Sequence, residues 1–379
     1  MKVEIHSHID EIPLLDWNGL VPENHPFLRH EFLHAMEKHG CVGERFGWLP
    51  RHIAVYDRGC LLGAMPLYEK FNSYGEFVFD HAWADAYQRA GLSYFPKLVS
   101  AVPYTPVTGP RLLCRQEQRE EIFPLLLNGA LRLAEKIGAS GFHCLFPCRQ
   151  QHRFLEQHQL LSRHDCQFHW PNDGYRDFAD FLDRLNSKKR KNILRERRRV
   201  RESGVALRRL NGHTASDLEW RQFSRFYRQI FEEKWGVATF NYPFFREVAQ
   251  QIPDQVVLVL AEMEGEAIAG ALMYCSDTTL YGRHWGTLQR VDGLHFEVCY
   301  YQGIEYCIEQ GLSVFEPGAQ GEHKIPRGFL PVMTRSSHWL ADDRFRAPIR
   351  HFVEHERQAV VDYMEQWQAA SPYKRVSHQ

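Results

Sequence analysis

Residues 256–286 read VVLVLAEMEGEAIAGALMYCSDTTLYGRHWG, and this stretch decides the fold. Apolar runs on either side of Gly265, and a third run after a further turn, predict three strands joined by tight connections. A helix is predicted over 296–310, because Gly311 provides its end, and the strand LSVFEPG follows at 312–318. With helices predicted upstream, the second half of the chain has the order αβββαβ, which is typical of an α/β domain.

The first half repeats this order in a looser form, beginning with the strand–turn–strand segment HIAVYDRGCLLGAMPLYEKF at 52–71. At a constant offset of 207 residues, identical residues recur in both halves: Ala54 with Ala261, Gly63 with Gly270, Ala64 with Ala271, Tyr74 with Tyr281 and Gly75 with Gly282. At an offset of 173 residues, Gly138, Ser140 and Phe142 recur as Gly311, Ser313 and Phe315. The repeat predicts a duplicated fold with domains over 1–168 and 175–379, in which Tyr74 and Tyr281 are equivalent.

The change of offset means that the first half carries 34 extra residues between its strands and its last helix. They lie at 80–113, DHAWADAYQRAGLSYFPKLVSAVPYTPVTGPRLL, and are rich in aromatic residues and prolines. A long connection inside a compact domain is usually a lid or a binding loop. We therefore expect 80–113 to cover a ligand.

The bulk composition limits the class of protein. The chain has 379 residues, of which 44% are hydrophobic and 25% charged, an ordinary globular balance for more than one core. Lys and Arg total 46 and Asp and Glu total 47, so the net charge indicates no particular partner. The nine cysteines show no pairing pattern, and no apolar run reaches the roughly 20 residues of a membrane helix. With no signal peptide in MKVEIHSHIDEIP, we expect a cytoplasmic protein without a transmembrane segment.

Polar groups concentrate in the segment 295–331, HFEVCYYQGIEYCIEQGLSVFEPGAQGEHKIPRGFLP. Glu297 and Tyr301 lie four residues apart on the predicted helix and therefore share one face. After the strand, the glycine-containing loop 316–331 brings together an amide, an acid, a histidine and two cations: Gln320, Glu322, His323, Lys324 and Arg327. Loops at the carboxyl ends of strands bind ligands in α/β folds, and cations there can hold phosphate or a developing oxyanion. A solvated surface loop is the alternative interpretation.

Four blocks give the chain a resemblance to a known family. They are YFPKLVSAVPYTPVTGPRLL at 94–113, GRHWG at 282–286, LHFEVCYYQGIEYCIEQGL at 294–312 and FEPGAQGEHKIPRGFLP at 315–331. In these blocks the chain is similar to the FemAB-type peptidyltransferases and, more closely, to the bacterial FemAB-like group of predicted N-acyltransferases. The resemblance implies an α/β fold of two tandem GNAT-like domains with mixed central sheets. It also implies transfer of an acyl or aminoacyl group to an amine, with a peptidoglycan precursor as acceptor.

The resemblance also implies roles for residues of the loop. A lysine after the last-strand loop of the peptidyltransferases stabilises the reacting carbonyl, and Lys324 stands at the matching place. We assign proton transfer to Glu322 or His323, and the orientation of a phosphate or amide to Gln320 and Arg327. The sequence contains no Gly-x-Ser-x-Gly or Cys-His signature, which argues against a covalent acyl-enzyme. The donor, acyl-CoA or aminoacyl-tRNA, stays open, and the alternative function is a GNAT-like module that binds a phosphorylated or cell-wall ligand without turnover.

Residues 187–201, SKKRKNILRERRRVR, hold nine basic residues and one acid. Such a helix could bind tRNA, since cationic side chains neutralise the phosphates of a nucleic acid. A solvated helix at the start of the second domain explains the pattern equally well. FemAB-type proteins have a comparable basic helix there, which supports the fold more than it supports RNA binding.

We place the site in a cleft between the two halves, with the loop 316–331 as one wall and 80–113 as its cover. Residues after each matched Tyr-Gly pair are expected to face that cleft. The full set of predicted substrate-binding residues is Glu316, Gln320, Arg327, Glu297, Tyr301, His284, Trp285, Asp80, Trp83, Lys97 and Arg111. Zinc accepts histidine and carboxylate ligands, but no standard spacing supports a site, and we predict no metal. The set considered was His284, His295, Glu297 and His323.

Overall fold

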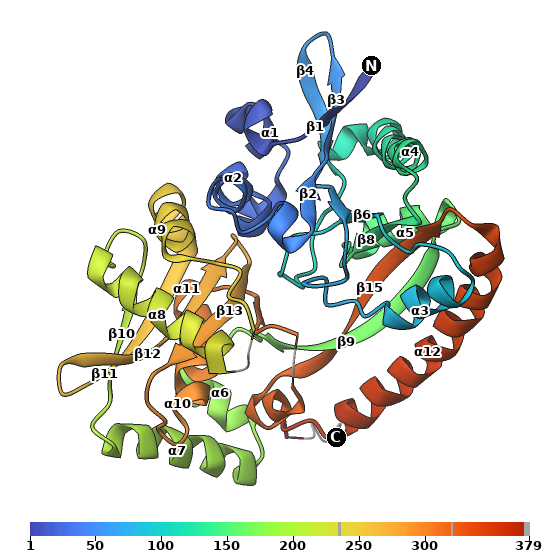
Figure 1. Cartoon of the computed structure of the whole chain (residues 1–379). Helices are drawn as coiled ribbons and strands as arrows, with labels where there is room; N and C mark the ends of the chain where they lie inside the picture. Colours follow the sequence, from blue (N-terminus) through green and yellow to red (C-terminus); the bar gives the residue numbers. More distant parts are fainter. Residues whose placement is uncertain (234–235, 320, 375–379) are drawn as a thin grey trace. The chain divides into compact units, whose positions relative to one another are not determined.

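The computed structural model describes residues 1–233, 236–319 and 321–374, and the chain divides into two compact units (Figure 1). The first unit consists of Met1–Cys166 and Met333–Asp362, and the second of Gln167–Val332 and Tyr363–Gln379. Strands β9 (Leu161–Pro171) and β15 (Leu330–Leu340) each contribute residues to both units. The domain boundaries expected at 168 and 175 stay a prediction.

The strands of the first unit form two groups. An antiparallel group has the order β1-β3-β4-β7, with β1 (Lys2–His6), β3 (His52–Asp57), β4 (Cys60–Met65) and β7 (Leu113–Cys114). A mixed group has the order β15-β8-β6-β5-β2, with β8 (Gly141–Leu145), β6 (Lys97–Ser100), β5 (Tyr68–Lys70) and β2 (Trp48–Pro50). Strand β6 runs parallel to β8 and antiparallel to β5.

The helices of the first unit are α1 (Leu14–Asn18), α2 (His30–Lys38), α3 (His81–Arg89), α4 (Arg119–Ile137) and α5 (Arg149–Gln157). Buried apolar residues recur along α4 at helical spacing, at Ile122, Leu126 and Leu133. The helix ends at Gly138, whose φ of 67° is the left-handed conformation that suits a C-terminal cap. The apolar face of α4 packs on β3 and β4 and forms the core of this unit.

The second unit is built on the stretch 256–286. Its three strands are β11 (Val256–Met263), β12 (Glu266–Cys275) and β13 (Thr279–Thr287), which pair antiparallel in sequence order. Helix α11 (Gln302–Gln310) ends at Gly311, and β14 (Val314–Glu316) then pairs parallel to β13. The predicted order of three strands, a helix and a strand is therefore confirmed. Strand β10 (Ala206–Leu210) flanks β11, and the far end of β9 flanks β14.

The other helices of the second unit are α6 (Phe178–Arg184), α7 (Ser187–Glu202), α8 (Asp217–Glu233), α9 (Tyr242–Gln251) and α10 (Leu294–Phe296). Helix α8 packs on β12 and β13, with α9 beside it (Figure 1). Helix α12 (Asp343–Ala369) has residues in both units. Helices on mixed sheets confirm the predicted α/β class. No helix in the described part of the chain is both long and apolar enough to cross a bilayer.

The predicted equivalence of Tyr74 and Tyr281 is wrong. Tyr74 lies in an exposed turn, whereas Tyr281 is buried in β13. In the second unit, β13 runs parallel to β14, the strand that follows helix α11. In the first unit, the strand that runs parallel to β8, which follows helix α4, is β6 and not the segment that contains Tyr74. The matched glycines also serve different purposes. Gly75 has a φ of 81° in its turn, while Gly282 lies in a strand where a Cβ would come within 3.2 Å of Phe315.

The predicted loop at 80–113 is also corrected by the structure. It contains helix α3 and strand β6, and it reaches the first residue of β7. Strand β6 lies inside the sheet between β5 and β8, and its residues Lys97 and Leu98 are fully buried. Residues 80–113 look like an insertion in the sequence because, at offsets of 207 and 173 residues, the second half has no segment that matches the sequence around β6.

Candidate functional site

A cavity of the second unit opens where β13 and β14 separate. The parallel pairing of these strands ends at Tyr281 and Glu316. Beyond that point β13 continues to Thr287, while the chain leaves β14 at Pro317. The separation leaves a cavity of about 150 Å³, whose lining includes Pro317 and four residues of β13. Ends of parallel strands are a common place for ligands in α/β folds.

A β-bulge lies in the same part of β13. Leu272 of β12 faces His284, while the next residue, Met273, faces Gly282, so Arg283 is the extra residue of the bulge. A bulge bends its strand and changes the direction of nearby side chains, and bulges are frequent beside active sites. Arg283 and His284 both line the cavity.

The helical wall of the cavity is irregular. Between α10 and α11 the backbone widens into a π-helical turn, η7 (Glu297–Tyr301). Such turns are frequent at functional sites. This turn places Cys299 and Tyr300 in the cavity wall with His295 of α10. The sequence predicts a regular helix here, because a π turn has no residue pattern of its own.

Lys324 lies in a short 3-10 helix, η8 (Glu322–Arg327), with only 1% of its surface exposed. Its ammonium group donates a hydrogen bond to the carbonyl oxygen of Gly318, and no carboxylate of the described residues pairs with it within 4 Å. Burial, together with the nearby charge of Arg283, lowers the pKa of Lys324 from 10.5 to about 7. Lys324 is not itself a lining residue of the cavity, but its charge acts on Arg283 and Cys299 of the wall, so it is a cation close to that wall that pairs with no carboxylate of the described residues.

The predicted proton carriers lie in different surroundings. His323 Nε2 is 2.7 Å from the hydroxyl of Tyr300, which connects this histidine to the cavity wall. Glu322 is exposed, and its carboxylate accepts a hydrogen bond of 2.9 Å from Tyr363. Gln320 lies outside the described residues. The structure therefore brings His323 to the cavity and points Glu322 elsewhere.

Other residues predicted in the second unit also reach the cavity. His284 and Trp285 line it, and the His284 ring packs against Tyr227 and Phe240 with ring centroids 5.1 and 4.9 Å apart. Burial among these rings holds the pKa of His284 well below its usual range. Glu316 ends β14, with its carboxylate 3.8 Å from Nδ1 of His169. A role of these residues in substrate binding stays a prediction.

Glu297, Tyr301 and Arg327 belong to a network that holds helix α7. Arg197 of α7 binds the Glu297 carboxylate through two hydrogen bonds of 3.0 and 2.9 Å. Glu196 of α7 accepts from Tyr301 and, at 2.8 Å, from Arg327. These polar groups are occupied within the unit, so their predicted contact with substrate would require this network to rearrange.

The basic segment 187–201 is likewise partly structural. Four of its arginines form ion pairs within the unit: Arg190 with Asp183, Arg197 with Glu297, Arg198 with Glu202, and Arg199 with Asp292. Other cations of α7 lie at the surface, namely Lys188, Lys191, Arg195 and Arg201. The ion pairs give the first group a structural role, whereas the exposure of the second group fits a solvated helix as well as a contact with RNA, which stays a prediction.

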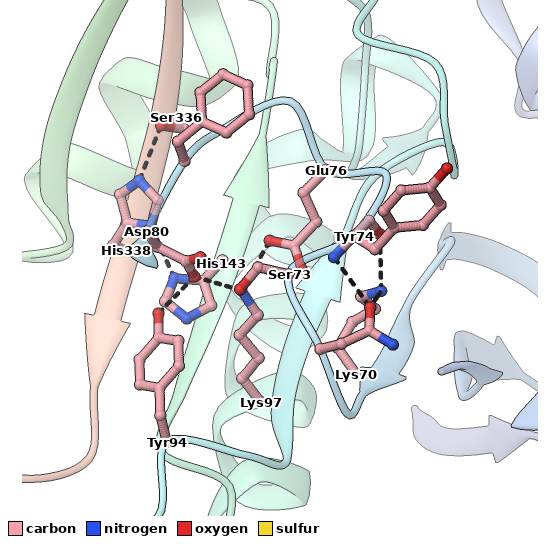
Figure 2. Close-up of polar contacts among 12 residues, drawn as sticks. Lys70, Ser73, Tyr74, Glu76, Asp80, Tyr94, Lys97, His143, Ser336 and His338 are labelled. Atoms are coloured by element: carbon pink, nitrogen blue, oxygen red, sulfur yellow. Dashed lines mark hydrogen bonds and ion pairs between the residues drawn. The ribbon is translucent and has the colours of Figure 1, made fainter. Parts of the chain in front are cut away.

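Two predicted residues of the first unit, Asp80 and Lys97, lie in a buried polar cluster (Figure 2). The ammonium of Lys97 donates to Glu76 at 2.8 Å and to Asp80, and Asp80 also accepts a hydrogen bond of 2.7 Å from Tyr94. Burial raises the pKa of Glu76 to about 7, against the opposing effect of Lys97. Burial would also raise the pKa of Asp80, but the charge and hydrogen bond of Lys97 hold that pKa below its ordinary value.

Two histidines adjoin this cluster. Nδ1 of His143 and Nδ1 of His338 are 2.7 Å apart, and Nε2 of His338 is 2.8 Å from the hydroxyl of Ser336 (Figure 2). Burial lowers the pKa of His143 to about 3, so this ring is neutral at physiological pH. Trp83 packs edge-on against His338, with ring centroids 4.9 Å apart. Asp80, Trp83 and Lys97 thus contribute to the core of the first unit.

Arg111 is also fully buried. Its guanidinium group donates to the backbone carbonyls of Val107, Pro110 and Leu145. These hydrogen bonds tie the chain around 107–111 to β8. A contact of Arg111 with a ligand stays a prediction.

The residues considered for zinc do not gather at one point. Glu297 is held by Arg197, and within residues 1–233, 236–319 and 321–374 no group of three or more His, Cys, Asp and Glu side chains could hold a metal ion. The rings of His295 and His323 pack edge to face, with their centroids 6.3 Å apart.

Several residues of the site are absent from the sequence-based set. Arg283, His295, Cys299 and Tyr300 line the cavity, and Glu76 holds Lys97. A signal for Arg283 exists, since it lies in the block GRHWG that supports the family resemblance. Tyr300 and Cys299 lie in another such block, but a helix of regular pitch would place them differently. Glu76 has no local signal.

Comparison with known proteins adds the family. A family model for FemAB-like proteins, described as peptidoglycan biosynthesis/recognition, matches residues 8–375. This chain belongs to the FemAB-like family. The family match confirms the resemblance that the four blocks indicate. No curated protein matches the chain.

Solved structures share the fold of this FemAB-like protein at low sequence identity. The structure of FemX has a TM-score of 0.53 and 12% identity, and the match covers 92% of this chain and all of that chain. The C-terminal domain of a putative lysylphosphatidylglycerol synthetase from Agrobacterium fabrum has a TM-score of 0.53 and 8% identity, over 88% of this chain and 93% of that chain. A protein of unknown function from Bacteroides thetaiotaomicron VPI-5482 has a TM-score of 0.53 and 11% identity, over 89% and 99%. The α/β fold with mixed sheets that the resemblance implies is confirmed, while its description as two tandem GNAT-like domains stays a prediction.

Proposed function

We propose that this FemAB-like protein transfers an acyl or aminoacyl group to an amine, with the reacting carbonyl in the cavity between β13 and β14. The observation that carries the proposal is Lys324, a buried ammonium that no carboxylate of the described residues neutralises. It lies beside a cavity whose volume of about 150 Å³ is suited to a small acyl group. The family description names peptidoglycan, so we propose the amine of a peptidoglycan precursor as the acceptor.

The proposed reaction forms a carbon–nitrogen bond and breaks the ester bond of an aminoacyl donor or the thioester bond of an acyl donor. The amine nitrogen attacks the carbonyl carbon, and negative charge develops on the carbonyl oxygen. An ammonium group has three donors, so Lys324 can keep its bond to Gly318 and donate another to that oxygen. Stabilisation of this charge in a dry site is often the main source of an enzyme's rate enhancement.

The amine must also lose a proton. Tyr300 lines the cavity, and its hydroxyl is hydrogen-bonded to His323. Burial and the charges of Lys324 and Arg327 lower the pKa of His323, so its ring is neutral near pH 7 and able to accept a proton. In the proposed path the proton passes from the amine through the Tyr300 hydroxyl to His323, which is exposed to water. The leaving group takes a proton from solvent.

The surface cations of α7 support an aminoacyl-tRNA as donor. Lys188, Lys191, Arg195 and Arg201 make no ion pair with the described residues and project from one helix of the unit that holds the cavity. A helix of this kind attracts the phosphates of a nucleic acid. Acyl-CoA is the other donor to test, although the sequence contains only partial versions of its phosphate-binding loop.

The test uses purified full-length protein with aminoacyl-tRNA or acyl-CoA as donor and a peptidoglycan-precursor peptide as acceptor. Replacing Lys324 with Ala should lower kcat about 100–1,000-fold, because one oxyanion donor is lost, while acceptor affinity stays unchanged. Lys136→Ala, at an exposed lysine of α4, is the matched control and should retain full activity. Full turnover by Lys324→Ala would refute the role of this residue. Binding of the acceptor without product from any donor would favour a binding module.

A further inference from the structure

The first unit carries a cationic groove that the proposed acyl transfer does not use. The groove has a volume of about 460 Å³ and lies along the beginnings of α4 and α5. Its main components are Arg119 and Phe123 of α4, and Arg149, Arg153 and Phe154 of α5. We call this site the arginine groove. Its volume falls in the range of small-molecule sites, about 300–1,000 Å³.

The guanidinium groups of the arginine groove are not neutralised by the protein. Within the described residues, Arg119, Arg149 and Arg153 form no ion pair within 4 Å and donate no side-chain hydrogen bond. Elsewhere in the same unit, Arg163 is bound by the Glu356 carboxylate at 2.6 and 2.8 Å. One carboxylate, Glu120, also lines the groove. Three cations and one anion leave a net charge of +2 in the lining.

Further positive charge surrounds the arginine groove. Arg335 of β15 lies near enough that, after burial, the charges of Arg149 and Arg153 contribute to lowering its pKa, with the Glu156 carboxylate opposing them. Arg119 and Arg149 are also the first residues of their helices, where the helix dipole is positive; α5 has no acid in its first turn, whereas α4 has Glu120 and Glu121 there. Like charges held together in this way repel one another, and a bound anion would relieve that repulsion.

We propose that the arginine groove binds a small molecule that carries a phosphate monoester on an aromatic or other flat apolar group. The planar guanidinium fork of arginine matches phosphate oxygens in pairs. A dianion matches the net charge of +2, whereas a carboxylate would neutralise only half of it. The apolar part of the ligand would lie on Phe123 and Phe154, whose ring centroids are 5.4 Å apart. The amides of Gln150 and Gln157, also in the lining, supply further hydrogen bonds.

The proposal is tested by calorimetry on the full-length protein at low salt, with phenyl phosphate, inorganic phosphate and benzoate as probes. Phenyl phosphate should bind most tightly, inorganic phosphate more weakly because it lacks the ring, and benzoate weakest because it has a single charge. Arg149→Ala and Arg153→Ala should each weaken phenyl phosphate about tenfold, the effect of losing a hydrogen bond to a charged group. Arg132→Ala is the matched control, because this exposed arginine of α4 lies outside the groove.

Thermal melting without ligand separates binding from folding. Because the groove arginines repel one another, Arg149→Ala and Arg153→Ala should melt at the same temperature as the unmodified protein or higher. The proposal is overturned if phenyl phosphate does not bind at millimolar concentration, or if Arg132→Ala weakens it as much as the groove variants do. Binding of a single-stranded RNA through Arg149 without binding of phenyl phosphate would also overturn it, in favour of a nucleic-acid surface.

Discussion

Two of the buried lysines, Lys97 of the first unit and Lys324 of the second, lie in opposite electrical surroundings. Lys97 of the first unit is held by two carboxylates, Glu76 and Asp80. Lys324 of the second unit donates to a backbone carbonyl, has the positive charge of Arg283 nearby, and pairs with no carboxylate of the described residues. Burial is nearly equal, at 0% and 1% exposure. The comparison shows that two equally buried lysines can differ in their partners: carboxylates pair with Lys97, and none of the described residues offers one to Lys324.

The largest expected difference concerns folding. Lys97→Met should lower the free energy of unfolding by about 3–5 kcal/mol, because it leaves Glu76 and Asp80 buried without their cation. Chemical denaturation with a fluorescence readout measures the loss. Lys136→Met, at an exposed lysine of the same unit, should change stability by less than about 0.5 kcal/mol. Equal stability of the two variants would show that the Lys97 cluster does not hold the core.

The corresponding change in the second unit should have the opposite sign. Lys324→Met should leave the free energy of unfolding unchanged or raise it by up to about 3 kcal/mol, because a buried charge without a carboxylate partner is removed. The folded-state pKa of about 7 lies below the ordinary 10.5, so protonation of Lys324 opposes folding. Its contribution to stability therefore improves as pH rises from 7 to 10.5. Denaturation at pH 7 and pH 9 should show this rise in the unmodified protein and a smaller rise in Lys324→Met.

The third prediction concerns the pH dependence of transfer. If the protonated Lys324 is the oxyanion donor, the single-turnover rate should lose about tenfold per pH unit above pH 7 from this group alone. Arg stays protonated throughout this range, so the ratio of the Lys324→Arg rate to the unmodified rate should increase with pH. Ionisation of the acceptor amine cancels in that ratio. A ratio that stays constant from pH 6 to 9 would contradict the assignment.

The smallest expected effect concerns Glu76. Its pKa is raised from 4.5 to about 7 in the folded protein, so the folded state binds more protons than the unfolded state between these values. Stability from this group is therefore fully present below pH 4.5 and is lost as pH rises to 7. Glu76→Gln does not titrate, and its stability relative to the unmodified protein should increase by about 2–3 kcal/mol from pH 5 to pH 8. A stability difference that does not change with pH would show that Glu76 is already ionised at pH 5.

Local patterns in the sequence predict the elements of the second unit well. The alternation of apolar runs and turns in 256–286 predicts β11, β12 and β13, and Gly311 correctly ends helix α11. Here each strand pairs with its neighbour in sequence, so short-range signals determine the topology. The cavity-lining residues His284 and Trp285 and the buried Lys324 are all candidates from this region, because the strand ends and the loop after β14 are close in the chain.

Long-range contacts explain what the sequence does not predict. Strand β6 pairs with β5 and β8, and no pattern within 80–113 itself predicts that pairing. His143 and His338 are in hydrogen-bond contact although 195 positions separate them. The π turn at Glu297–Tyr301 differs from a regular helix by backbone geometry alone. The low pKa of Lys324 depends on burial, and the polar sequence of this loop gives no indication that the lysine is buried.

The first unit has a consequence for protein synthesis. Strand β8 pairs on one side with β15, from Leu145 with Ser336 to Gly141 with Leu340. The ribosome finishes Cys166 long before it reaches Met333, about 170 residues later, which at 5–20 residues per second is a delay of roughly 10–30 s. During this interval the nascent chain exposes an unpaired strand edge, a template for association with other chains. We therefore expect the edge of β8 to need protection by chaperones while the rest of the chain is translated.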